Sequence, residues 1–366
     1  MELLDTLIIG GGQAGLATAH HLRRAGLTAR ILEADATPTG SWGRYYASLT
    51  LFSPTRYSSL PGKPFGGNPG RYPTRDEVIA YLAEYAAGLD VPIETNATAI
   101  SVAATGDVFA VDLADGRRMS AASVVSATGG FGRPHLHALP GLDTFGGVVL
   151  HSADYRSPQQ FAGRRVLVLG AGNSAVQIVV ELADHAHVTL TSRTPVRFIS
   201  QRPLGVDVHA WLHWSGVERL PLGERLAGRP VSVLDAGAYR AALAAARPGW
   251  RPMFHHLDAG EVVWADGTRE PVDAVILATG YRPSVEHLTD LRGPDGRGPL
   301  DDAGRPLHRR GVSTTVPGLA YCGLEWQYGF ASATLRGVGH DARRIATALR
   351  RHLTTRTVDR QTPART

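Results

Sequence analysis

Two glycine-rich turns constrain the fold of this chain more than any other feature of its sequence. The first turn begins at Gly10, directly after the apolar run 7–9, and the second begins at Gly170, after the apolar run 166–169. An amphipathic stretch with helical periodicity follows each turn. A buried strand, a glycine turn and a helix, in that order, form the dinucleotide-binding βαβ unit. Two such units in a chain of 366 residues predict an α/β protein with two dinucleotide sites.

Each small residue in these turns has its own physical reason. The first glycine makes the tight turn, the second lets the main chain approach a pyrophosphate, and the third position lets the helix pack closely on the strand. The free N–H groups and partial positive charge at the start of the helix then attract the phosphates. The residues that we expect to contact cofactors are Gly10, Gly12, Gln13, Ala14 and Gly15 in the first turn and Gly170, Gly172, Asn173, Ser174 and Ala175 in the second.

The residue after the next predicted strand distinguishes the two units. Glu33 lies 23 positions after Gly10 and Arg193 lies 23 positions after Gly170, so we expect equivalent places for the two side chains. A carboxylate accepts hydrogen bonds from ribose hydroxyls and repels a 2′-phosphate, whereas a guanidinium can hold that phosphate through two hydrogen bonds. The first unit therefore favours FAD or NAD, and the second favours NADPH, with NADH as a second option. The alternative for Arg193 is a solvated surface arginine.

Two alanine-threonine-glycine runs, at 127–129 and 278–280, indicate where the chain passes between the two units. Each ends a predicted buried strand in a turn of small residues, where main chain can approach a cofactor. We expect an FAD domain of residues 1–155 and 282–366, with an NADPH domain of residues 160–275 inserted into it. Both domains are expected to be three-layered and Rossmann-like. The cofactor-binding residues expected in the two runs are Thr128, Gly129, Thr279 and Gly280.

Composition argues against several other functions. The 38 basic and 33 acidic residues give a net charge of +5, but the arginines are scattered without an aromatic stripe, so we expect no nucleic-acid partner. The one cysteine, Cys322, leaves no dithiol and is expected to be a packing residue. Adjacent histidines such as His255 and His256 have poor metal-ligand spacing, so no metal is expected. Without an apolar run of about 18 residues or a recognisable export signal, we expect a cytoplasmic protein that makes no use of a membrane.

Two helices outside the nucleotide units can also be predicted. Residues 75–89 have an amphipathic pattern, and Thr74 is the expected N-cap. A last helix is expected to end near Leu353, followed from about Thr354 by a polar, frayed tail.

A third motif carries a resemblance to a known family. Residues 145–155 fit F-x-G-x-x-x-H-x-x-x-[F/Y] just before the second glycine turn, and in this they resemble the fingerprint of flavin-containing monooxygenases. The motif closes with Tyr155, where Baeyer–Villiger relatives usually have tryptophan. Further runs resemble a short bacterial group that includes flavoproteins linked to arsenic or cation resistance. These runs are residues 40–42, 51–54, 58–62, 72–75 and 151–155.

The resemblance implies a reaction. NADPH would reduce FAD, and reduced flavin would react with O₂ to give a C4a-(hydro)peroxyflavin, which would transfer one oxygen atom to a small sulfide, amine or ketone. The partners implied are that small molecule and O₂, with a homodimer as an option. The resemblance also implies cofactor contacts from Ser41, Trp42 and Gln327, and a structural role for His151 in linking the domains.

Phe52 departs from the family pattern. By the resemblance it occupies the place where many flavin-containing monooxygenases have an asparagine near the flavin C4a atom, and we assign it as the catalytic-site residue. A phenyl ring cannot donate the hydrogen bond that such an asparagine provides. This feature supports an alternative function, an NADPH oxidase or flavin reductase that releases hydrogen peroxide. A non-catalytic nucleotide-binding protein is the third interpretation.

Overall fold

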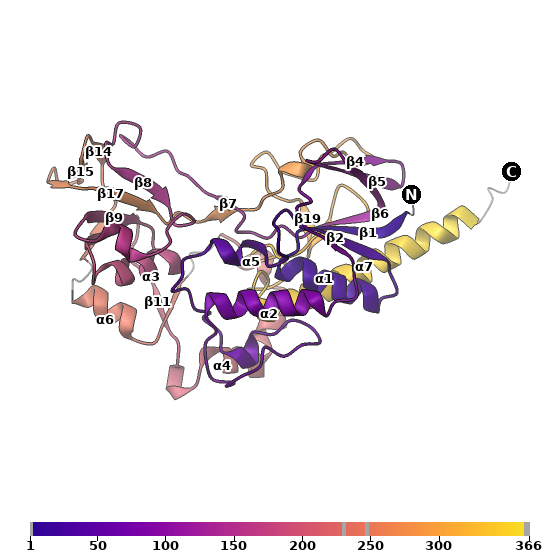
Figure 1. Cartoon of the computed structure of the whole chain (residues 1–366), viewed down its shortest axis with the longest axis horizontal. Helices are drawn as coiled ribbons and strands as arrows, with labels where there is room; N and C mark the ends of the chain where they lie inside the picture. The colour runs from indigo at the N-terminus through magenta and orange to yellow at the C-terminus, as the bar shows by residue number, and fades with distance from the viewer. Residues whose placement is uncertain (1–2, 229–231, 246–248, 362–366) are drawn as a thin grey trace.

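The two glycine-turn units form two separate β-sheets, which lie toward opposite ends of an elongated molecule (Figure 1). The computed structural model describes residues 3–228, 232–245 and 249–361. Among the helices in these ranges, none combines the length and apolar character that crossing a membrane requires.

The first sheet grows outward from β1, whose neighbours β2 and β6 both run parallel to it. The strand order is β19-β20-β21-β6-β1-β2-β3, and the antiparallel hairpin of β4 and β5 joins through β6. The bounds are β1 Leu4–Ile9, β2 Ala29–Leu32, β3 Ile93–Glu94, β4 Ala99–Thr105, β5 Val108–Leu113, β6 Arg118–Ser126, β19 His308–Arg309, β20 Val312–Ser313 and β21 Leu319–Tyr321.

Helices α1 (Gln13–Arg24), α2 (Arg75–Ala87) and α7 (Leu335–Gln361) share one apolar core with this sheet. The predicted N-cap of α2 is confirmed, because the Thr74 side chain accepts from the Glu77 N–H and the Glu77 side chain accepts in return. The predicted end of the last helix is wrong: α7 continues past residue 353 to Gln361. A polar composition does not by itself end a helix, since solvated arginine and threonine can occupy every face of a turn that leaves the core. Cys322 is a packing residue as expected, and burial raises the pKa of its thiol to about 12.

The second sheet is entirely parallel, with the order β13-β10-β9-β17-β8. Its bounds are β8 Val148–His151, β9 Arg165–Leu169, β10 His187–Ser192, β13 Gly249–Pro252 and β17 Ala274–Leu277. Helices α3 (Asn173–Leu182) and α6 (Ala238–Ala244) contact each other beside it. A small antiparallel sheet, β14 (His256–Asp258), β15 (Glu261–Val263) and β16 (Arg269–Pro271), shares a second core with it. Strand β8 lies before the expected start of the inserted domain at residue 160, yet it pairs with β17.

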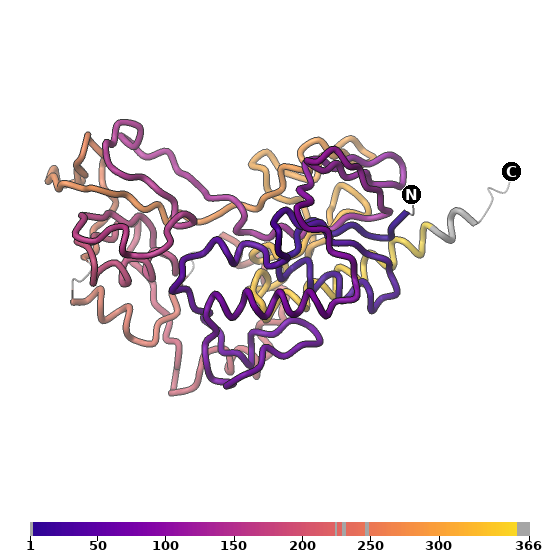
Figure 2. The backbone as a smooth tube through the Cα atoms, in the orientation of Figure 1, coloured from indigo at the N-terminus to yellow at the C-terminus, as the bar shows by residue number. Residues whose placement is uncertain are grey.

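The chain passes twice between the sheets, and both passages can be followed in Figure 2. Strands β7 (Arg133–Pro134) and β18 (Tyr281–Arg282) pair antiparallel at these passages. A segment of residues 201–228, here called the arm, leaves the second sheet region and places α4 beside the helices of the first (Figure 1). The remaining short elements are β11 Phe198–Ser200, β12 Val233–Asp235, α4 Val208–Ser215, α5 Gly223–Leu226 and the 3₁₀ turns η1 Gly40–Arg44, η2 Thr55–Tyr57, η3 Pro158–Phe161, η4 Pro203–Gly205, η5 Val217–Arg219 and η6 Glu286–Leu288.

Candidate active site

The glycines of the first turn pack closely against neighbouring main chain and side chains. Gly10 has a φ of +106°, and a Cβ atom there would lie 2.7 Å from the carbonyl oxygen of Ala127. A Cβ atom on Gly15 would lie only 1.9 Å from the carbonyl oxygen of Gly10. Both positions therefore require glycine, as the expected turn demands. Helix α1 begins at an N-cap glycine, Gly12, with no side-chain cap, so its first N–H groups remain suited to an anion.

Glu33, which follows the neighbouring strand β2, holds this turn through hydrogen bonds. Its Oε2 accepts from the Gly11 N–H at 2.6 Å, and its Oε1 accepts from the Asp35 N–H at 2.8 Å. The side chain is buried, and burial raises the pKa of the Glu33 carboxyl against the opposing effect of these two hydrogen bonds. Each carboxylate oxygen keeps a second lone pair, so the group can still accept from ribose hydroxyls.

Several other expected cofactor residues lie around the same turn. Trp42 donates from Nε1 to Gln13 Oε1 at 3.2 Å, and Gln13 donates from Nε2 to the Ala333 carbonyl at 2.7 Å. Ser41 is 3.2 Å from the Tyr45 hydroxyl, and burial raises the pKa of Tyr45 to about 12. A Cβ on Gly12 would meet the Cα of Gly40 at 3.2 Å. The structure therefore brings Gln13, Ser41 and Trp42 together.

The first alanine-threonine-glycine run lies directly against the first glycine turn, and Gln327 lies in the loop that follows β21. Gln327 is fully buried, and its Oε1 accepts from the Leu324 N–H at 3.2 Å. Its Nε2 has no hydrogen-bond partner in the described part of the chain, so it is a donor available to a bound group. Thr128 donates to the Ser284 carbonyl at 2.6 Å, and Gly129 lies beside the main chain of Gly323.

The second glycine turn has the same shape but is open. Gly170 has a φ of +152°, and a Cβ there would lie 2.5 Å from the Ala278 carbonyl oxygen. Ala175 is accommodated and fully buried in the third position, where the first turn has Gly15. A Cβ on Gly172 would meet nothing within 4 Å, and α3 also starts without a side-chain cap. Asn173 and Ser174 begin this helix half-exposed.

The strand register corrects the expected equivalence of Glu33 and Arg193. The Gly10 N–H donates to the Leu32 carbonyl at 2.8 Å, whereas the Gly170 N–H donates to the Thr191 carbonyl at 2.9 Å. The residue that matches Glu33 is therefore Ser192, and Arg193 stands one position later. The shift has a simple cause: α3 is two residues shorter than α1, while the segment between the helix and the matched strand position is one residue longer, so the second unit returns to its sheet one residue sooner.

Ser192 and Arg193 have different surroundings. Ser192 is buried, and its hydroxyl donates to the Thr194 carbonyl and accepts from Trp250 Nε1 at 2.9 Å. Arg193 is exposed and makes no hydrogen bond or ion pair with any residue that the structure describes. Its guanidinium is free to meet an anion at the carboxyl end of β10, where ligands of such sheets bind.

His151 joins the two passages between the sheets. Its Nδ1 accepts from the Ala153 N–H at 3.1 Å, so the ring proton resides on Nε2, which donates to the Gly280 carbonyl at 3.1 Å. Burial lowers the pKa of His151, in agreement with a neutral ring. Thr279 donates to the His135 carbonyl at 2.5 Å. Thr279 and Gly280 therefore lie at a junction that His151 holds.

Phe52 contacts the arm through its main chain. Its side chain is 38% exposed, and its carbonyl accepts from Gln201 Nε2 of the arm at 3.0 Å. No hydrogen bond or ring contact within residues 3–228, 232–245 and 249–361 joins it to either glycine turn.

Sequence reasoning missed two groups of polar residues. Tyr46 lies in the core of the second sheet and donates to Gln177 of α3, and Tyr155 donates to Glu181 of the same helix at 3.0 Å. The other group surrounds Asp207 at the start of α4. An aspartate before an apolar stretch is an N-cap signal that could have found this position, but no pattern in the sequence indicates its long-range partners.

Segment 40–46 extends from one nucleotide unit to the other. At one end Gly40 contacts Gly12, and at the other Tyr46 contacts Gln177, one turn into α3. The N-cap of α1 and the second turn of α3 therefore flank a single short segment. A surface cavity of about 1000 Å³ lies elsewhere, at the amino ends of β9 and β10. Dinucleotides bind at the carboxyl ends of such strands, so this cavity is not the cofactor site.

Comparisons with known proteins agree with this geometry. Residues 7–215 match the family described as pyridine nucleotide-disulphide oxidoreductase. The chain is 32% identical to a CzcO-like oxidoreductase of Geobacillus kaustophilus, over 96% of this chain and 99% of that protein. It is 30% identical to an indole-3-pyruvate monooxygenase of Oryza sativa subsp. japonica, over 93% and 90%. A solved double mutant of the flavin monooxygenase from Stenotrophomonas maltophilia superposes with a TM-score of 0.81 at 35% identity, covering 96% of this chain and all of that one.

Proposed function

This chain belongs to the flavin-containing monooxygenase family, and from that premise we propose that it is an FAD-dependent, NADPH-consuming monooxygenase of a small organic substrate. The family membership, the α/β fold with two dinucleotide-binding domains and the oxidoreductase class were all predicted from the sequence and are confirmed. The identity of the dinucleotides, the substrate class and the use of O₂ are proposals.

One observation carries the proposal: segment 40–46 touches the N-cap of α1 at Gly12 and the second turn of α3 at Gln177. Two dinucleotides held by these helices would bring their reactive ends to the same segment. Both helices start without a side-chain cap, the turns leave room for main chain to meet a pyrophosphate, and Gln327 Nε2 is a donor with no partner among the residues that the structure describes. The residues present therefore fit a flavin dinucleotide and a nicotinamide dinucleotide.

The chain's own residues bind and separate the two cofactors. We assign the pyrophosphate of FAD to the start of α1, with Glu33 accepting from ribose hydroxyls, and the NADPH pyrophosphate to the start of α3. Arg193, exposed and unpaired in the described chain, is assigned to the 2′-phosphate. Residues 1–155 and 282–366 form the proposed FAD domain and 160–275 the proposed NADPH domain, with β8 contributed to the NADPH side.

Bound flavin supplies hydride acceptance from NADPH and the subsequent reaction with O₂. In the balanced reaction NADPH, a proton, O₂ and the substrate yield NADP⁺, water and a substrate that carries one oxygen atom. The protein orients the participants and excludes water, and Phe52 is the side chain that we assign to the apolar wall of the reacting face. The proposed substrates are small sulfides, amines or ketones.

The phenyl ring of Phe52 favours a second candidate, an NADPH oxidase that releases hydrogen peroxide. Labelled O₂ decides between the two, because a monooxygenase places one labelled atom in the organic product and an oxidase places both in peroxide. A panel of sulfides, amines and ketones should be scored for labelled product rather than for NADPH consumption. Absence of label from every product, with stoichiometric peroxide, would contradict the monooxygenase proposal.

A further inference from the structure

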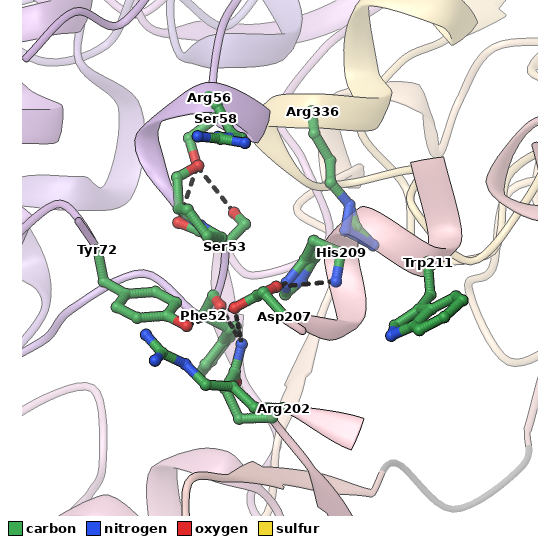
Figure 3. A network of polar contacts seen from close by, with 12 residues as sticks. Phe52, Ser53, Arg56, Ser58, Tyr72, Arg202, Asp207, His209, Trp211 and Arg336 are labelled. Carbon is green, nitrogen blue, oxygen red and sulfur yellow. Dashed lines mark hydrogen bonds and ion pairs between the residues drawn. The ribbon is translucent and has the colours of Figure 1, made fainter. Parts of the chain in front are cut away.

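The carboxylate of Asp207, in the arm, is surrounded by four hydrogen-bond donors (Figure 3). Its Oδ1 accepts from the N–H of His209 and from Nδ1 of the same residue, both at 2.8 Å. Its Oδ2 accepts from Gln201 Nε2 at 2.9 Å and from the Tyr72 hydroxyl. Burial would raise the pKa of Asp207, but these hydrogen bonds outweigh it, so the pKa lies below its usual value and the group is ionised.

Gln201 links the Asp207 carboxylate to the main chain of Phe52. Its amide nitrogen donates to both Asp207 Oδ2 and the Phe52 carbonyl. Since both partners are acceptors, the amide has only one orientation that satisfies them. Gln201 is itself buried, and its main chain pairs with Val208 and Asp235. This link therefore has little freedom to move.

Tyr72 belongs to the segment that pairs with the Phe52 segment. The Leu51 N–H donates to the Pro73 carbonyl at 2.8 Å, and the Thr55 N–H donates to the Arg71 carbonyl at 2.8 Å. Residues 49–58 and 69–75 thus form one loop pair, here called the Phe52 loop. Asp207 holds one side of it directly through Tyr72 and the other through Gln201.

The arm that carries Asp207 is fixed to the start of α7. The Arg336 side chain is 10% exposed and approaches Glu218 of the arm, with 3.5 Å between Nε and Oε2. The Gly223 N–H donates to the Tyr328 carbonyl at 2.8 Å, and a Cβ on Gly223 would lie 1.8 Å from the Trp326 carbonyl oxygen. Such close packing leaves the arm no room to slide, so it is a rigid support for the Phe52 loop.

We propose that Asp207 is a positioning residue for the oxygenation reaction: it holds the Phe52 loop against the arm and so keeps Phe52 at the reacting face. This inference rests on the proposed function and on the assignment of Phe52 to that face. A loosened loop would admit water, and more of the NADPH consumed would then appear as hydrogen peroxide.

Asp207→Asn separates the positioning role of Asp207 from its local role as the N-cap of α4. Asp207 is also the N-cap of α4, but asparagine is an equally good N-cap, so the helix start is preserved. Asparagine has one acceptor oxygen where the carboxylate has two, and its NH₂ group would face donors. A milder second variant, Tyr72→Phe, removes one hydroxyl only. The matched control is Tyr57→Phe, in the same loop, whose hydroxyl makes no hydrogen bond within the described chain.

The experiment measures two quantities on flavin-loaded protein. Hydrogen exchange of peptides covering residues 49–58 reports the hold on the loop without any turnover. We expect roughly tenfold faster exchange in Asp207→Asn, a smaller increase in Tyr72→Phe and none in Tyr57→Phe. Peroxide released per NADPH, with a substrate that the wild type oxygenates, should rise in the same order, while the KM for NADPH stays within about twofold.

Each outcome decides the inference. Faster exchange together with more peroxide, at unchanged flavin content, supports it. Unchanged exchange in Asp207→Asn would show that the carboxylate does not hold the loop. Faster exchange with an unchanged peroxide fraction would remove the link to the reaction. If the wild type oxygenates nothing, the proposed function fails, and the positioning role fails with it even where exchange shows that Asp207 anchors the loop.

Discussion

The two glycine turns have one shape and two kinds of surroundings. In the first, Gly11 is bonded by Glu33, and a Cβ on Gly12 would lie 3.2 Å from the Cα of Gly40. In the second, a Cβ on Gly172 would meet nothing within 4 Å, and Arg193 extends into solvent. The first glycine turn is therefore enclosed, and the second glycine turn is open.

This difference matches two kinds of ligand. An enclosed turn with a buried carboxylate suits a group that stays bound through many turnovers, because the departure of that group would leave buried polar atoms of the protein without partners. An open turn with an exposed arginine suits a cosubstrate that enters and leaves in every cycle and is attracted by charge. We propose that the enclosed turn retains FAD and that the open turn exchanges NADPH.

The largest effect that could contradict this comparison should come from adding a methyl group to each turn. Gly15→Ala should lower the free energy of unfolding by about 3 kcal/mol and abolish flavin retention, because its Cβ has no space beside the Gly10 oxygen. Gly172→Ala should keep the flavin and raise the KM for NADPH by about tenfold, because its methyl group would face only the incoming pyrophosphate. Flavin-to-protein absorbance ratios and thermal unfolding measure both. Equal flavin loss in the two variants would contradict the distinction.

Carboxylates of the two regions should respond to pH in opposite directions. In the first region Asp341 is buried, its Oδ2 has no partner in the described chain, and burial raises its pKa from 3.8 to about 6. Asp341 ionises at a lower pH in the unfolded chain than in the folded protein, so the free energy of unfolding falls by about 3 kcal/mol between pH 4 and pH 7. The free energy of unfolding of Asp341→Asn, relative to that of the wild type, should therefore be about 3 kcal/mol higher at pH 8 than at pH 4.

The matching carboxylate of the second region is Asp273. It is half-buried and accepts from the main chain and guanidinium of Arg165, which hold its pKa well below the usual range. Its contribution is fully present above the unfolded pKa and is lost progressively as pH falls below about 4, so Asp273→Asn should cost the most stability at pH 7 and less at pH 3. Chemical denaturation of both variants across pH checks the pair. Parallel pH profiles would show that the two sites do not differ in this way.

Arg193→Ala tests the charge at the open turn. A hydrogen bond to a charged group contributes about 1.5–3 kcal/mol, so the KM for NADPH should rise roughly ten- to a hundredfold while that for NADH hardly changes. The control is Arg164→Ala, an exposed arginine at the amino end of the same sheet. A similar loss with both cofactors would mean that Arg193 acts on folding rather than on the 2′-phosphate.

Phe52→Asn gives the smallest expected effect, at the loop between the two regions. An amide would supply the donor that the ring lacks, worth about 1 kcal/mol, so peroxide per NADPH should fall by up to about fivefold. Phe52→Leu, which stays apolar and donates nothing, is the control. A rise in peroxide for Asn would show that the ring keeps water out, and no change in either variant would place Phe52 away from the flavin.

Much of the fold follows from local patterns in the chain. The two turns, their strands and helices, and the capping of α2 depend on residues within a few positions of one another, so periodicity and glycine spacing predict them. The family could be named because residues 145–155 form one continuous motif. The end of α7 was predicted wrongly because polarity indicates exposure, not the end of a helix.

By itself, the sequence determined that two βαβ units exist and that a carboxylate follows one and a guanidinium the other. Only the tertiary structure decided that Ser192, not Arg193, stands opposite Glu33, because register depends on how far each helix runs before the chain returns. Only the fold brings Tyr72, Gln201 and Asp207 together from segments up to 135 residues apart. Hydrogen bonds between distant segments leave no periodic signal in a single chain, since each depends on packing that all the intervening residues establish.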